Sequence, residues 1–199
     1  LATLGWPRLA SAAACDDTAN WIPPDAFLTD LPRLMQALRV PAIGMAVVER
    51  GEVVWARNLG VTNAETRAPV ADDTLFEDAS LSKPVFAYLV LQLADQGVID
   101  LDAPLVRYRR MDYLADHPWV DRVTARDVLR HSTGMPNWRK DPAHEKLVPA
   151  AKPGTRIDYS GEAIFWLQLV VEKLTGESLD ESMQRLLFGD QAHDMRLRH

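Results

Sequence analysis

The sequence of 199 residues has little cysteine, no long apolar run and no surplus of positive charge, and each shortage excludes a class of protein. Its single cysteine, Cys15, excludes an intrachain disulfide framework and a metal site built from several cysteines. No segment approaches the roughly 18 consecutive apolar residues of a membrane-spanning helix. The formal net charge of −6 gives no reason to expect nucleic acid as a partner, and the short basic cluster at 107–110 is interpreted as a solvated face. The remaining composition is that of a globular protein, and its length suits one sizeable core or two small subdomains.

Signatures of several common catalytic and binding sites are also missing. The sequence contains no phosphate-binding glycine loop, no Gly-x-Ser-x-Gly elbow and no His-Glu-x-x-His pattern. Its histidines are scattered without metal-ligand spacing, and His131 is interpreted as a loop or core histidine rather than as the base of a catalytic triad. The sequence therefore predicts neither a cofactor nor a metal.

Residues 1–24 are predicted to be the remnant of a leader or a flexible linker. The small residues at 9–14 (LASAAA) resemble the end of a secretory leader, although Pro7 and Arg8 interrupt the apolar region before them. Because the chain begins with leucine rather than methionine, we expect its true start to be missing. The same pattern makes Cys15 a candidate for a lipid anchor, as a weaker alternative. Together these features predict an extracytoplasmic protein, either periplasmic or secreted.

Residues 25–199 are predicted to form one partial α/β domain. Its α/β part covers 25–79, and its mainly helical part covers 80–199. The elements of the first part, predicted from apolar periodicity and β-rich runs, are a helix at 25–40 and two hairpin strands at 42–49 and 52–59.

Only helices are predicted in the second part. They lie at 80–96, 124–130, 160–174 and 178–188. The first of them is apolar nearly all round, which predicts a central buried helix. A two-stranded sheet is marginal on its own and leaves open edges. We therefore expect the chain to be truncated, with strands missing from its C-terminal side.

The strongest local signal for chemistry is a Ser-x-x-Lys motif formed by Ser80 and Lys83 at the start of the buried helix. Residues three apart share one helical face, so the lysine amine can reach the serine hydroxyl. A serine is a poor nucleophile until a neighbouring base takes its proton, and we expect the pair to be buried together. Alone, the tetrapeptide also fits an N-cap serine beside an exposed lysine. Ser82 is the nearest rival nucleophile, but it lies on a different face of the helix.

The sequence around this motif resembles the class C β-lactamase and penicillin-binding protein type of serine hydrolase, which also includes related carboxylesterases. Residues 76–84 (FEDASLSKP) are similar to the nucleophile segment of that family, and residues 96–104 (QGVIDLDAP) to the turn after its nucleophile helix. Residues 124–136 (TARDVLRHSTGMP) are similar to its following helix and loop. The resemblance extends in order over roughly residues 30–190, which chance does not readily supply. It implies a β-lactamase/transpeptidase-like fold, of which this chain holds the N-terminal part.

The resemblance also implies a third site residue. The family's second motif, Tyr-x-Asn, matches Tyr159 but places Gly161 where the asparagine belongs. It implies that Tyr159 works as a general base or shares the proton with Lys83, whereas the alternative is a tyrosine using its hydroxyl as a polar handle at a helix edge. Without the asparagine side chain, a contact with a substrate amide is lost. We find no third motif, Lys-Thr-Gly or His-x-Gly, and with it one oxyanion donor of the family is missing.

Two classes of function remain open. The first is a serine hydrolase that forms an acyl-enzyme on Ser80 from an ester or amide carbonyl, with Lys83 and Tyr159 as proton shuttles. Its substrate is a small molecule or a peptide, and β-lactam, peptide and simple ester all fit. The second is a penicillin-binding or sensor module, or a pseudoenzyme that uses the same fold for recognition. For the 199-residue chain itself we expect little or no turnover.

Overall fold

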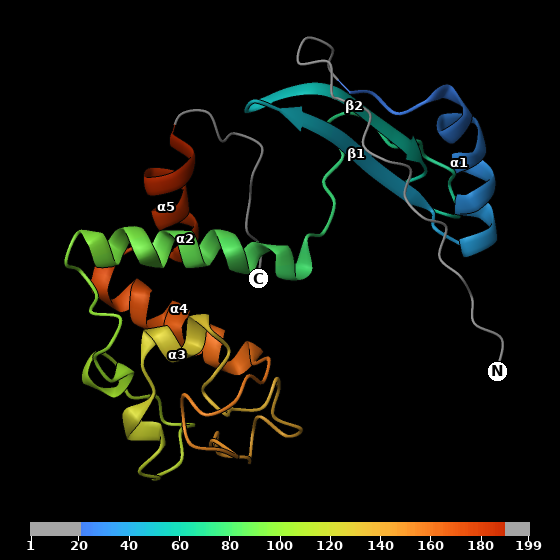
Figure 1. The fold of residues 1–199 in the computed structure, drawn as a ribbon. Helices are drawn as coiled ribbons and strands as arrows, with labels where there is room; N and C mark the ends of the chain where they lie inside the picture. Colours follow the sequence, from blue (N-terminus) through green and yellow to red (C-terminus); the bar gives the residue numbers. More distant parts are fainter. Residues whose placement is uncertain (1–20, 190–199) are drawn as a thin grey trace, which may run out of the picture. The chain divides into compact units, whose positions relative to one another are not determined.

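A computed structural model describes residues 21–189, which divide into two compact units at residues 77 and 78 (Figure 1). The leader-like residues 9–14 and Cys15 lie outside the described residues, so the predicted localisation and lipid anchor stay predictions. Within residues 21–189, no helix combines the length and the hydrophobicity that crossing a bilayer requires.

The first unit contains helix α1 (Asp25–Leu38) and strands β1 (Ala42–Glu49) and β2 (Glu52–Gly60), as the sequence predicted to within two residues. Helix α1 ends because Arg39 adopts the left-handed conformation (φ 55°), which lets the amide of Val40 bond to the carbonyl of Met35 at 2.9 Å.

The two strands pair antiparallel through the turn at Arg50 and Gly51, both of which have positive φ. This is the geometry of the two-residue hairpin turns whose twist matches that of the strands. Among the described residues the sheet has only these two strands, and none of their residues is fully buried. The predicted combination of a helix with a β-hairpin is therefore confirmed.

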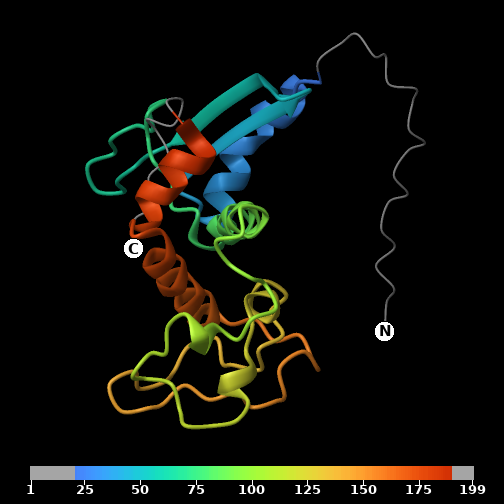
Figure 2. The same cartoon turned by 90° about the vertical axis from the view of Figure 1, so that its left-hand side faces the viewer.

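The second unit is helical. In Figures 1 and 2, α4 lies between α5 and the loops that contain α3. Its elements are a 3₁₀ turn η1 (Ala79–Leu81), α2 (Ser82–Asp95), 3₁₀ turns η2 (Leu105–Arg107) and η3 (Val120–Arg122), α3 (Ala125–Leu129), α4 (Gly161–Thr175), α5 (Leu179–Met183) and a π-helical turn η4 (Gln184–Phe188).

The hydrophobic core of the second unit forms around α2 and α4. Trp166 of α4 is fully buried, and its indole N–H donates to the carbonyl of Arg109 at 2.9 Å. The guanidinium of Arg109 in turn donates to the carbonyl of Leu169 at 3.0 Å. The prediction that the basic cluster is a solvated face was therefore wrong for Arg109, which ties a loop to α4. A backbone carbonyl as partner leaves no signal in the sequence.

Helix α2 is buried on one face only. Leu89 and Val90 are fully buried, whereas Tyr88 and Leu91 are 57% and 46% exposed. The prediction of a helix buried all round is therefore wrong for the described residues, because their core covers a single face of α2.

Because α2 has one buried and one exposed face, replacing one leucine on each face tests this description of the core. Leu89→Ala should lower the free energy of unfolding by about 2–5 kcal/mol, because it leaves a cavity in the core. Leu91→Ala should change it by less than about 1 kcal/mol, because the side chain is already half in water. Urea unfolding followed by circular dichroism measures both, and equal effects would contradict this description of the core.

Candidate active site

Ser80 lies in the 3₁₀ turn η1 rather than in the helix proper, and Lys83 lies in the first turn of α2. The preceding residue, Ala79, has φ 47°, a left-handed conformation that costs a residue with a side chain roughly 1–2 kcal/mol. Pro84 is tolerated in the first turn, because amides there have no partner within the helix. The helix start is therefore where the motif predicted it, and a strained backbone precedes the serine.

The three predicted site residues meet at one oxygen atom. The ammonium of Lys83 donates to the Ser80 hydroxyl at 3.0 Å, and the Tyr159 hydroxyl lies 2.9 Å from the same oxygen. Tyr159 comes from the segment just before α4, 79 residues further along the chain, and all three side chains belong to the second unit. The structure thus brings together a hydroxyl, an amine and a phenol.

The site is more open than the sequence predicted. Ser80 is exposed, Tyr159 is 45% exposed and Lys83 is half-buried. The expectation that serine and lysine are buried together is wrong for the described residues, because Ser80 lies in the turn η1 before α2, and no residue of that turn is buried. The motif predicts where Ser80 and Lys83 lie relative to the start of the helix. It does not show whether other residues cover that end of the helix.

Lys83 makes the phenol of Tyr159 more acidic. Its hydrogen bond, together with the one between Tyr159 and Ser80, lowers the pKa of the Tyr159 hydroxyl below its ordinary value. The Lys83 nitrogen also lies 5.2 Å from the centre of the tyrosine ring. A positive charge at this distance favours the phenolate, the form that can accept a proton.

His131 contacts Tyr159 through its ring and the residues on either side of it through its backbone and its Nδ1 atom. Its ring packs on the tyrosine ring with centroids 4.6 Å apart, and its carbonyl accepts from the amide of Asp158 at 2.7 Å. The amide of Ser160 donates to its Nδ1 at 3.4 Å. Burial, with a smaller contribution from Lys83, lowers the pKa of His131, which favours the neutral ring that can accept this bond. The sequence placed His131 in a loop or core, and only its position within the family-like segment 124–136 could have indicated this contact.

A capped helix and a left-handed turn place His131. The hydroxyl of Thr124 accepts from the amide of Asp127 at 3.1 Å, and the Asp127 carboxylate accepts from the amide of Thr124 at 3.2 Å. This reciprocal capping box fixes the start of α3, as the sequence predicted for Thr124. The helix ends one turn later, where His131 itself has φ 53°.

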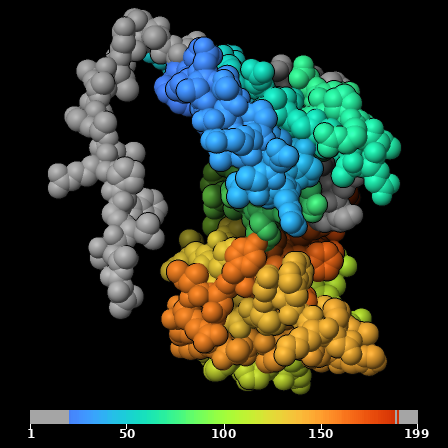
Figure 3. Space-filling view, turned by 90° about the vertical axis from the view of Figure 1, so that its right-hand side faces the viewer, coloured from blue at the N-terminus to red at the C-terminus, as the bar shows by residue number. Residues whose placement is uncertain are grey.

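The first residues of α4 are bonded to the loop at 136–139. The Ser160 hydroxyl donates to the carbonyl of Pro136 at 2.8 Å, and the amide of Gly161 donates to the side-chain oxygen of Asn137 at 2.9 Å. In the space-filling view of Figure 3 the loops at 131–160 appear in yellow and orange and pack against one another on the surface. No pattern in the sequence predicts this attachment, which fixes the chain directly after Tyr159.

Within residues 21–189, no group of three or more histidine, cysteine, aspartate or glutamate side chains is placed to hold a metal ion.

Comparisons with known proteins identify the family of the chain. The family model described as Beta-lactamase matches residues 29–198. Esterase EstB of Burkholderia gladioli is 35% identical over 134 residues, which cover 61% of this chain and 34% of the esterase. Penicillin-binding protein 4 of Amycolatopsis lactamdurans is 29% identical over 162 residues, which cover 75% of this chain and 42% of that protein. The chain thus spans less than half the length of these relatives.

Solved structures show the same fold. A class C β-lactamase in complex with cefoxitin superposes with a TM-score of 0.70 at 26% identity, over 82% of this chain and 48% of that one. The octameric penicillin-binding protein homologue from Pyrococcus abyssi also gives a TM-score of 0.70, at 24% identity, over 82% of this chain and 42% of its own. The described units therefore have the architecture of the corresponding part of the β-lactamase/transpeptidase fold. With a family model covering most of its length, this chain belongs to the β-lactamase family of serine hydrolases.

Proposed function

We propose that the protein is a serine hydrolase that forms an acyl-enzyme on Ser80, with Lys83 and Tyr159 moving the proton. The observation that supports this best is the position of the Ser80 oxygen, 3.0 Å from the Lys83 nitrogen and 2.9 Å from the Tyr159 oxygen. These are hydrogen-bond distances, within which a proton can leave the serine as its oxygen attacks.

The proton path follows from the donors and acceptors present. A lysine ammonium has no lone pair, so the phenolate oxygen of Tyr159 is the better acceptor for the Ser80 proton, with Lys83 holding the negative charge in place. As the Ser80 oxygen bonds to the carbonyl carbon, Tyr159 takes the proton of the hydroxyl. The bond between that carbon and the leaving alcohol or amine then breaks, and the leaving group takes a proton from Lys83, which Tyr159 protonates again. Water then attacks the acyl-enzyme by the same path in reverse and releases the acid and the free serine.

The substrate class that these residues favour is an ester or amide carbonyl, as in a simple ester, a peptide or a β-lactam. Among the relatives one is named an esterase, one a penicillin-binding protein and one a class C β-lactamase. Gly161 offers no side chain to hold a substrate amide, which argues for esters over β-lactams. The alternative, a penicillin-binding or sensor module, uses the same acylation but releases the acyl group slowly.

Ser80→Ala tests the nucleophile, and Ser82→Ala is its matched control two residues away. Measured on the protein at the full length that its gene encodes, Ser80→Ala should lower kcat for a p-nitrophenyl ester by at least about a thousandfold, because it removes the oxygen that attacks the carbonyl. Ser82→Ala should retain most activity, because its hydroxyl donates to the carbonyl of Ala79 at 2.8 Å instead.

Intact-protein mass spectrometry with a fluorophosphonate and with a penicillin completes this test. A single adduct on Ser80 with steady ester turnover supports the hydrolase. A stable penicillin adduct without turnover supports the sensor alternative. Unchanged hydrolysis in Ser80→Ala would rule out the proposed nucleophile.

A second prediction concerns the charge on Tyr159. Lys83→Met removes the positive charge that lowers the pKa of the phenol, so the pKa of Tyr159 should rise and its phenolate should appear at higher pH. Ultraviolet absorbance of phenolate against pH measures the titration, and the component that disappears in Tyr159→Phe identifies Tyr159. A titration that stays in place, or that moves to lower pH, would show that Lys83 does not act on the phenol.

A further inference from the structure

The place of the missing asparagine side chain is filled by a tryptophan from another segment. A Cβ atom built on Gly161 would lie 2.5 Å from Cζ2 and 2.6 Å from Cη2 of Trp138, closer than atoms can approach. The indole of Trp138 therefore occupies the volume in which a side chain at position 161 would begin. Glycine at 161 and tryptophan at 138 fit each other as a pair.

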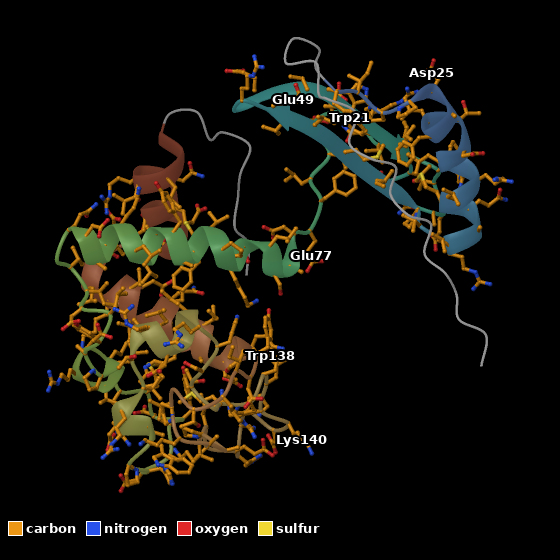
Figure 4. All side chains as sticks on the ribbon, viewed as in Figure 1. Trp21, Asp25, Glu49, Glu77, Trp138 and Lys140 are labelled. Carbon is orange, nitrogen blue, oxygen red and sulfur yellow. The ribbon has the colours of Figure 1, made fainter. Side chains whose placement is uncertain are left out.

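The backbone on both sides of Trp138 is fixed to residues next to Gly161. Before it, the carbonyl of Asn137 accepts from the amide of Glu162 at 3.0 Å. After it, Arg139 donates to the carboxylate of Glu162 at 2.9 Å, with side chains only 10% and 5% exposed. Figure 4 marks Trp138 on this loop. The backbone that carries the indole is thus fixed on both sides of Trp138.

Position 161 follows two residues after Tyr159, whose hydroxyl lies 2.9 Å from the Ser80 oxygen. Ser160 is extended (φ −136°, ψ 112°), and in extended backbone the side chains at positions two apart point to the same side. The side chain of Tyr159 reaches the Ser80 oxygen, so the direction that a side chain at 161 would take lies on the side of the nucleophile. Trp138 fills that direction and is nevertheless 64% exposed, which leaves most of its surface free for a ligand.

From this arrangement we infer that Trp138 is a specificity-determining residue, which gives the acyl side of the site an aromatic surface and selects apolar acyl groups without an amide. This inference rests on the proposed function of Ser80. An asparagine side chain both donates and accepts hydrogen bonds, whereas an indole has a single donor and two apolar faces. An amide placed against the ring loses its hydrogen-bond partners. A hydrocarbon chain placed there is stabilised, because its apolar surface leaves water.

Two p-nitrophenyl esters that differ only in acyl length test the inference. Burial of a methylene against one ring is worth about a twofold gain in kcat/KM, and the hexanoate has four more methylenes than the acetate. The wild-type protein should therefore prefer the hexanoate over the acetate by roughly fifteenfold. Trp138→Ala should lower this preference about fivefold, and Trp138→Phe, which keeps a ring, should lower it by less. The control is Trp21→Ala, which removes a tryptophan exposed to a similar extent (59%) outside the unit that holds Ser80, and it should leave the preference unchanged.

Gly161→Ala provides a second, independent test of the inference, because its new methyl group must displace the indole of Trp138. It should reduce the hexanoate preference in the wild-type background and have no further effect once Trp138 is alanine. The same double-mutant cycle on the urea midpoint detects the steric conflict without any activity. Additive effects in both measurements would contradict the pairing of the two residues.

The outcomes separate this inference from the proposed function. If hydrolysis depends on Ser80 but Trp138→Ala leaves the acyl preference unchanged, the inference is overturned and the hydrolase stands. If the wild-type protein shows no hydrolysis that Ser80→Ala removes, the proposed function is overturned and the inference with it.

Discussion

The attachment of α4 to the loop after α3 is the constraint on which the site depends. Tyr159 lies at the end of this loop, directly before α4, and its hydroxyl must stay within hydrogen-bond distance of an oxygen 79 residues earlier in the chain. The ring of His131 on one side and the cap at Ser160 on the other leave the tyrosine little freedom. Such preorganisation matters because a hydroxyl is activated only while its partners remain in place.

Much of this arrangement could be predicted from the sequence, wherever it depends on residues that are close together in the chain. The Ser-x-x-Lys spacing places hydroxyl and amine on one helical face, and the capping pattern at Thr124 and Asp127 marks the start of α3. Gly51 and Arg50 between two β-rich runs indicate the hairpin. In each case the partners are a few residues apart, so a pattern in the sequence suffices.

What could not be predicted depends on partners far apart in the chain. The burial of α2 was overestimated because a composition that is apolar all round does not show which face the core covers. Arg109 bonds to a backbone carbonyl of α4, and Trp138 packs over Gly161, although neither contact has a sequence signature. The absence of asparagine at position 161 is visible in the sequence. Only the structure shows that the indole of Trp138 occupies the space of a side chain at this position.

The nearly buried ion pair of Arg139 and Glu162 limits how this loop can change over evolution. Losing one partner leaves an uncompensated charge away from water, which typically costs about 3–5 kcal/mol, whereas exchanging both for apolar residues is often neutral. A single substitution at either position therefore lowers the stability of the protein, whereas replacing both residues together avoids this loss. Descendants of this sequence should keep the two residues or lose them together, and the loop between them should be inherited as one block.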